Sequence, residues 1–182
     1  GVELIKAAKA KGLNVSASVY MHHLLFDENE VEDFDTNFKV IPPLRKKKDV
    51  KSLFKGIKEG TIDMISTQHV PLDVESKRLE FEYATPGMAN IEFAFPLALK
   101  ALGDLEKVVQ MMSVAPRKLF QKEINSIEEG AKANFILVNP SEKSTVKDAQ
   151  RKSKSSNSPF FGKELIGSVK AVFNNGQNQW ND

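Results

Sequence analysis

The sequence contains no cysteine, and only three histidines, two tyrosines and one tryptophan occur among its 182 residues. The absence of cysteine excludes disulfide bonds, thiolate zinc sites and a cysteine nucleophile, and it fits a cytoplasmic protein. No apolar run approaches the roughly 20 residues that a membrane-spanning helix needs. The opening residues, "GVELIKAAKAKG", form an amphipathic pattern that lacks the apolar stretch of a signal peptide. We therefore predict a cytoplasmic protein that does not enter the membrane.

The charges nearly balance, with 26 Lys and Arg against 24 Asp and Glu, so the formal net charge is +2. The basic cluster "RKKKDVK" opens a helical pattern and is interpreted as a solvated face, so no nucleic-acid function is predicted. The length and composition fit one soluble globular domain, or one and a half. The chain opens inside a helical pattern without an N-cap residue, and we expect it to be part of a longer protein.

Hydrophobic periodicity predicts a βαβ unit near the start of the chain. The expected order is a helix over 2–11, a strand over 13–19, a loop over 20–46, a helix over 47–59 and a strand over 62–67. Two strands joined by a helical crossover are parallel. The motifs "MHH" and "QH" then lie just beyond the carboxyl ends of the strands, where α/β proteins place their sites.

Further helices are expected after the polar stretch 68–90. Residues 90–102 are apolar nearly all round, which predicts a buried helix that Pro96 ends or kinks. Asp104 is a candidate N-cap for a further helix, and residues 115–121 form a short one. The expected apolar stripe of the helix after Asp104 consists of Leu105, Val108, Val109 and Met112.

From residue 124 the pattern changes to that of a small β-domain. Residues 133–139 and 168–180 have the pattern of strands, and Asn174-Asn175-Gly176 is a hairpin-turn signal. The Ser- and Lys-rich stretch 141–158 is expected to be a mobile connection. We divide the chain into residues 1–123, the last part of a barrel, and residues 124–182, part of the β-domain.

Several motifs in this order resemble the carboxyl-terminal part of a dihydroorotase, a member of the amidohydrolase superfamily. They are "VELIKAAKAKGLNVSASV…HHLL", "NFKVIPPLR", "GTIDMISTQHVP", "PGMANIEFAFPL", "APRKLF" and "EGAKANFILVNP". Allantoinases and hydantoinases are related alternatives. The resemblance implies an α/β fold, namely the end of a metal-dependent (β/α)8 barrel beside a small β-sandwich. Residues 13–19 then correspond to the seventh barrel strand and residues 62–67 to the eighth.

The resemblance also implies zinc-dependent hydrolysis of a cyclic amide, but the matching positions depart from the family pattern. Gln68 stands where the family carries the metal-binding Asp that also moves the proton, and Leu72 stands where it carries a substrate-binding His. Ile41 replaces the substrate-binding Asn, whereas the substrate-site turn Pro86-Gly87 is kept. The other metal ligands of the family have no counterpart in this sequence. We therefore predict no metal or cofactor for this chain, although the family uses zinc.

The remaining polar candidates have simpler interpretations. His22 and His23 are expected to point to opposite faces of an extended segment and to form structural hydrogen bonds. His69 is expected to anchor a loop. Asp63 is expected to be exposed at a strand start. Arg45 is expected to pin the long loop through a salt bridge, and anion binding is the alternative. Trp180 is expected to pack within the β-domain.

The leading hypothesis is a dihydroorotase-like protein of pyrimidine biosynthesis that is catalytically inactive as this chain and has a structural or partner-binding role. The resemblance implies aspartate transcarbamoylase as a possible partner, and self-association is the alternative. A second hypothesis is an active zinc-dependent cyclic amide hydrolase whose other ligands lie upstream. A third is a split or proteolysed remnant without a function of its own.

Overall fold

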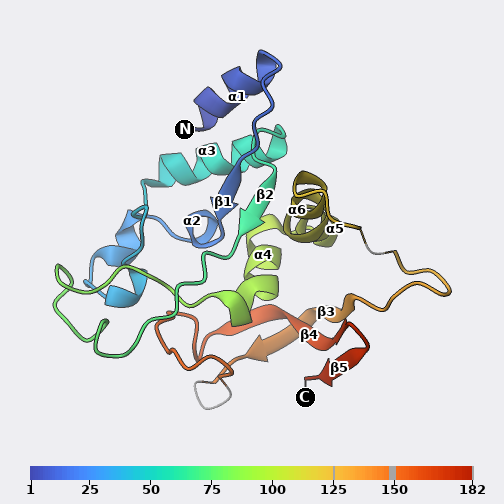
Figure 1. The fold of residues 1–182 in the computed structure, drawn as a ribbon. Coiled ribbons are helices and arrows are strands. Elements are labelled where there is room, and N and C mark those ends of the chain that lie inside the picture. The colour runs from blue at the N-terminus through green and yellow to red at the C-terminus, as the bar shows by residue number, and fades with distance from the viewer. Residues whose placement is uncertain (125, 148–150, 182) are drawn as a thin grey trace.

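The computed structural model describes residues 1–124, 126–147 and 151–181. A parallel pair of short strands lies at the centre of its first half: β1 (Ser18–Tyr20) and β2 (Met64–Ser66), with Val19 opposite Ile65. Helix α3 (Lys47–Lys58) forms the crossover between the two strands (Figure 1). The predicted βαβ unit, with parallel strands, is therefore confirmed.

Helix α3 packs against helix α1 (Val2–Ala10), which precedes the first strand. The two helices approach closely at Gly56, where a Cβ atom would lie 2.9 Å from Cγ1 of Val2. Gly60 follows the end of α3 with φ +74°, a left-handed conformation that glycine adopts readily. Both predicted helices of this region are present with nearly the predicted ends.

The predicted strand over 13–19 is too long, because only its last two residues and Tyr20 pair with a neighbour. Before Ser18, the backbone amide of Ala17 instead donates to the side chain of Asp63, and Leu13 is 56% exposed. A strand needs a partner for its backbone groups. The carbonyl of Ala17 still accepts from the amides of Asp63 and Met64, but the partner strand begins at Met64, so residues 13–16 have no strand partner among the described residues.

The loop over 20–46 contains three short helical segments and is not structureless. These are α2 (His22–Leu25), η1 (Glu28–Val31) and η2 (Thr36–Phe38). The side chains of Asp27 and Asp35 cap the last two by accepting from Asn29 N and Asn37 N. Single turns of this kind are too short to produce a clear hydrophobic period.

The apolar segment after residue 90 forms η3 (Ile91–Phe93) and α4 (Ala94–Leu102). Pro96 is the third residue of α4 and is buried; it does not end the helix, because the amides of a first helical turn need no intrahelical acceptor. Gly103 closes the helix with φ +67°.

Asp104 caps α5 (Leu105–Val109), as predicted, by accepting from the amides of Glu106 and Lys107. A π-helical turn, η4 (Gln110–Val114), and helix α6 (Ala115–Leu119) follow. The predicted apolar stripe is partly wrong: Met111 is buried beside Val108, while Val109 is 49% exposed. The wider π turn shifts the face that a regular helix would present.

The last part of the chain forms an antiparallel sheet of β3 (Phe135–Thr145), β4 (Glu164–Asn174) and β5 (Gln177–Trp180). Asn174 pairs with Gln177 across the predicted turn, where Asn175 and Gly176 have positive φ. Trp180 meets Phe173 edge to face, with ring centroids 5.9 Å apart, but it is 58% exposed.

The stretch 141–158 was predicted to be a mobile connection, and the described part of it contradicts this. Strand β3 continues through Thr145, and Asn157 and Ser158 are buried. Asn157 binds the backbone of the distant residues Val70 and Leu72, so its amide holds the segment in place. Residues 148–150 lie outside the described residues.

One hydrophobic core connects the parallel strands with the antiparallel sheet. Helix α4 lies between them and contacts β4 (Figure 1). The core includes Val19, Ile65, Phe93, Leu97, Phe160 and Leu165. The boundary at 123/124 stays a prediction. None of the helices in the described parts of the chain is both long and apolar enough to cross a membrane.

Candidate functional site

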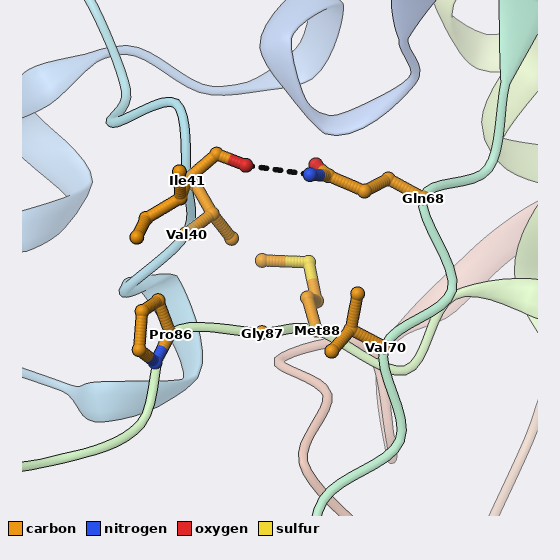
Figure 2. A pocket seen from close by; sticks show the side chains of 7 residues that line it. All are labelled: Val40, Ile41, Gln68, Val70, Pro86, Gly87 and Met88. Carbon is orange, nitrogen blue, oxygen red and sulfur yellow. Dashed lines mark hydrogen bonds between the residues drawn. The ribbon is translucent and has the colours of Figure 1, made fainter.

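The carboxyl ends of β1 and β2 lead to a small pocket of about 200 Å³. Three segments meet there, around residues 40, 68 and 87 (Figure 2). The lining residues are Val40, Ile41, Gln68, Val70, Pro86, Gly87 and Met88. No lining side chain is charged, and Gln68 is the one polar side chain among them. The structure thus brings together four of the five positions that the sequence singled out.

Gln68 bridges the pocket from one side to the other. Its Nε2 donates to the backbone carbonyl of Ile41 at 2.5 Å, as Figure 2 shows. Its Oε1 is buried and has no partner among the described residues. The backbone at Gln68 has φ +43°, an unfavourable conformation for a residue other than glycine. The amide can make this bridge because it carries N–H donors, which an ionised carboxylate lacks.

Ile41 contributes its carbonyl to this bridge and leaves its side chain 65% exposed. Leu72 does not line the pocket. Its backbone amide donates to Asn157 Oδ1, and its side chain packs near Gly87. The fifth position therefore lies beside the other four and faces a second pocket.

The turn Pro86-Gly87 is held tightly. A Cβ atom on Gly87 would lie 2.7 Å from Val70 Cγ1 and 2.9 Å from Leu72 Cδ1, so only glycine fits without a shift. The amide of Gly87 donates to Lys39 O at 2.8 Å, and Val70 N donates to Met88 O. Backbone and packing contacts thus fix the shape of the pocket on this side.

His22 and His23 both lie in α2, not in an extended segment, so the prediction that they point to opposite faces is wrong. Their ring centroids are 4.5 Å apart, and both side chains are buried. His22 Nδ1 lies 3.3 Å from Asn90 Nδ2, and His23 Nε2 lies 3.0 Å from Pro42 O. These contacts agree with the predicted structural function of the two side chains.

Burial sets the protonation of this histidine pair. It lowers the pKa of His22 to about 3, with a smaller contribution from the neighbouring His23, and it also lowers the pKa of His23. His22 is therefore neutral at pH 7. A neutral imidazole with a pKa near 3 is a poor general base under ordinary conditions.

His69 accepts hydrogen bonds at Nδ1 from the amides of Asn90 and Ile91, at 3.1 and 3.3 Å. It therefore joins the end of β2 to the start of η3, as a loop anchor would. Asn90 is fully buried, and its side chain also donates to Thr67 O. The sequence analysis missed Asn90, although a lone amide directly before an apolar helical run was a usable signal.

The described residues around the pocket do not fit a zinc ion. They contain no group of three or more His, Asp or Glu side chains close enough to share a metal. Gln68 directs its amide nitrogen at a carbonyl, and Nδ1 of His69 already accepts two backbone N–H groups.

Two charged candidates have structural contacts. Asp63 is not exposed as predicted: it is partly buried, pairs with Lys9 at 2.6 Å and accepts from Ala17 N at 2.8 Å. The Nε of Arg45 lies 3.9 Å from Asp49 one turn further along, and its side chain is 66% exposed. Arg45 therefore makes a weak contact with α3 and does not pin the long loop.

Lys77 is a buried cation that the sequence analysis missed. Its side chain is 7% exposed, and its Nζ donates to the carbonyls of Thr36, Thr85 and Gly87. Burial lowers the pKa of Lys77 to about 8. The surrounding residues "ESKRLE" are mostly polar and predict an exposed loop, so no local signal indicates that Lys77 is buried.

Comparisons with known proteins agree with this architecture. Residues 2–178 match the amidohydrolase family, and the chain belongs to that family. It is 41% identical over 181 residues to a dihydroorotase of Caldicellulosiruptor saccharolyticus, covering 97% of this chain and 42% of that protein. A dihydroorotase of Ruminiclostridium cellulolyticum is also 41% identical, over 172 residues, covering 92% of this chain and 40% of that protein. The chain therefore spans less than half the length of these relatives.

Solved structures show the same fold. A D-hydantoinase (dihydropyrimidinase) from Thermus sp. matches with a TM-score of 0.84 and 25% identity, over 99% of this chain and 43% of that one. The inactive dihydroorotase-like domain of a Chaetomium thermophilum CAD-like multifunctional protein matches with a TM-score of 0.66 and 22% identity, over 97% and 47%. The fold class predicted from sequence, the carboxyl-terminal part of an amidohydrolase barrel, is confirmed.

Proposed function

We propose that this chain is the carboxyl-terminal part of a dihydroorotase-like protein of pyrimidine biosynthesis whose site does not catalyse hydrolysis. The observation that carries the proposal is the bridge from Gln68 to Ile41. At the position where the family motif has a metal-binding carboxylate, this chain has an amide that joins two loops. The side chain therefore supports the shape of the pocket and cannot accept and return a proton.

The surroundings of Gln68 support the same proposal. The other described groups that line the pocket are aliphatic side chains, one thioether and the Pro-Gly turn. His22, the nearby buried imidazole, is held neutral by its surroundings. Removing a general base alone lowers a rate by about 10² to 10⁴, and here no described group is placed to replace it.

The function that remains for such a protein is structural or partner-binding. We propose aspartate transcarbamoylase, or a second copy of the same protein, as the partner. A location in the cytoplasm is part of the same proposal, and it rests on the absence of cysteine.

Zinc binding by this chain is the first test. We expect equilibrium dialysis against micromolar zinc to leave less than stoichiometric metal on the wild type and on Gln68→Asp. The matched control is Gln110→Asp, which adds the same charge on an exposed position of η4. Stoichiometric zinc on the wild type that is lost in His69→Ala would refute the proposal at its centre.

The second candidate function is an active zinc-dependent cyclic amide hydrolase with ligands in other parts of the protein. The identity of 41% to proteins named dihydroorotase favours it. Its requirement is a His-x-His motif near the first strand of the complete protein. Reading the upstream sequence distinguishes the candidates, because a protein without that motif lacks the metal ligands that the active family uses.

A further inference from the structure

The buried ammonium of Lys77 has hydrogen-bond acceptors but no ion-pair partner among the described residues, and Asp35 acts on it only from a distance. Three backbone carbonyls accept its N–H groups, which satisfies the donors without neutralising the charge. Lys77 forms no ion pair with any described residue. A buried charge without a direct ion-pair partner destabilises the fold, so an anion placed nearby would stabilise it.

A second pocket, of about 190 Å³, lies directly beside Lys77. Three segments form it: the η2 turn, the loop after β2 and the stretch before Ser158. The polar lining residues include Asn37, Asp73, Lys77, Arg78, Ser156 and Asn157. This pocket is separate from the one beside Gln68, with which it shares no lining residue.

Three hydrogen-bond donors of this second pocket are free. The side chains of Asn37, Arg78 and Ser156 have no hydrogen-bond partner in the described part of the chain. Asn157 is different, because both ends of its amide are engaged, with Leu72 N and Val70 O. The free groups are an amide, a guanidinium and a hydroxyl, which is a donor set suited to an oxyanion.

One carboxylate, Asp73, also lines the pocket, and its oxygens are already occupied. They accept from Ser76 N at 2.7 Å and from Ser76 Oγ at 2.8 Å, and these hydrogen bonds lower the pKa of Asp73. Asp73 is thus an ionised group turned toward its own loop. Lys77 and Arg78 give the lining two positive charges against this one negative charge.

We propose that this second pocket binds a small oxyanion, the phosphate or carboxylate group of a metabolite. Arg78, Ser156 and Asn37 donate hydrogen bonds to the anion. The ammonium of Lys77, whose N–H groups are bound to carbonyls, attracts the anion by its positive charge. Since one water occupies about 30 Å³, a pocket of about 190 Å³ has room for an oxyanion with an organic substituent. The proposal goes beyond the proposed function and does not depend on it.

Calorimetric titration of this chain with inorganic phosphate, and separately with succinate, tests the proposal at constant ionic strength. We expect saturable binding of one of the two, which also tells phosphate from carboxylate. Arg78→Gln should weaken that binding about tenfold, because it removes one charged hydrogen-bond donor. Lys51→Gln is the matched control: it removes an exposed charge from α3, away from the pocket, and should change nothing.

Two results would overturn the proposal. One is the absence of saturable binding of both anions. The other is an equal loss of affinity in Arg78→Gln and Lys51→Gln, which would show attraction by net charge alone. Lys77→Met should abolish binding if it folds, as judged by circular dichroism, and retained binding in a folded Lys77→Met would also contradict the proposal. If Lys77→Met does not fold, the comparison of Arg78→Gln with Lys51→Gln decides.

Discussion

The pocket beside Gln68 and the pocket beside Lys77 are nearly equal in volume, about 200 and 190 Å³, but opposite in chemistry. The first is lined by aliphatic groups and one neutral amide. The second carries a buried ammonium, an exposed guanidinium and free donors. The loop after β2 contributes lining residues to both pockets. Within that loop, the charged side chains Asp73, Lys77 and Arg78 line the second pocket, and none lines the first.

Gly87 lines the first pocket and lies next to Leu72 and Lys77, which line the second. A Cβ atom added to it would meet Val70 of the first pocket and Leu72 of the second, while its carbonyl accepts from Lys77. A change on one side of this turn is therefore expected to affect the other side.

The largest expected effect is a loss of stability in acid, caused by the buried neutral imidazole of His22. Burial lowers the pKa of His22 to about 3 from 6.5, so the unfolded chain binds a proton that the folded chain does not. Stability should therefore fall as pH drops from about 6.5 toward 3. Urea unfolding between pH 4 and 7 measures this, and His22→Gln should flatten the slope. An unchanged slope in His22→Gln would show that other groups cause it.

Gly87→Val should destabilise the protein by about 3 kcal/mol, because its side chain collides with Val70 and Leu72. Ala131→Val, a change on an exposed position, should cost little and serves as the control. Urea unfolding measures both. A loss below about 0.5 kcal/mol for Gly87→Val would mean that Gly87 is not packed tightly between Val70 and Leu72.

The contribution of Lys77, beside the second pocket, to the stability of the protein should change in the alkaline range. Burial lowers the pKa of Lys77 to about 8 from 10.5, with Lys39 adding to the shift and Asp35 opposing it. Between about pH 8 and 10.5 the unfolded chain holds a proton that the folded chain can release, so this contribution to stability rises with pH. The unfolding free energy of the wild type should therefore rise over that window relative to that of Lys77→Met. A constant difference would contradict the assignment.

The smallest expected effect comes from the bridge across the first pocket. Gln68→Ala should destabilise the protein by about 1 kcal/mol, since it removes one hydrogen bond. Gln68→Glu should cost more, because an ionised carboxylate would face the carbonyl of Ile41. Gln110→Ala, on an exposed position of η4, is the control in the same urea series. Greater stability of Gln68→Glu would argue that the position still favours a carboxylate.

The sequence predicted the parts of this fold that depend on local pattern. The helix over 47–58, its glycine stop, the Asp104 cap and the hairpin at Asn175-Gly176 follow from residue types and spacing alone. The resemblance also identified four of the residues that line the first pocket, namely Ile41, Gln68, Pro86 and Gly87. Each of these features is set by residues close together in the chain or by an ordered motif.

The features that the sequence did not predict depend on distant partners. Lys77 is buried because carbonyls at positions 36, 85 and 87 surround it, and nothing near Lys77 in the sequence indicates this. Asn157 is fixed by the backbone of residues 70 and 72, so its Ser-rich surroundings gave the wrong expectation. The strand over 13–19 failed for the opposite reason, since its pattern suited pairing but its partner began only at Met64.

The most direct test of the central claim is turnover of dihydroorotate by the complete protein purified with zinc. The account predicts no hydrolysis above the uncatalysed rate, and none gained in Gln68→Asp. Hydrolysis by the wild type that disappears in Gln68→Ala would contradict it, because Gln68 would then take part in a working site.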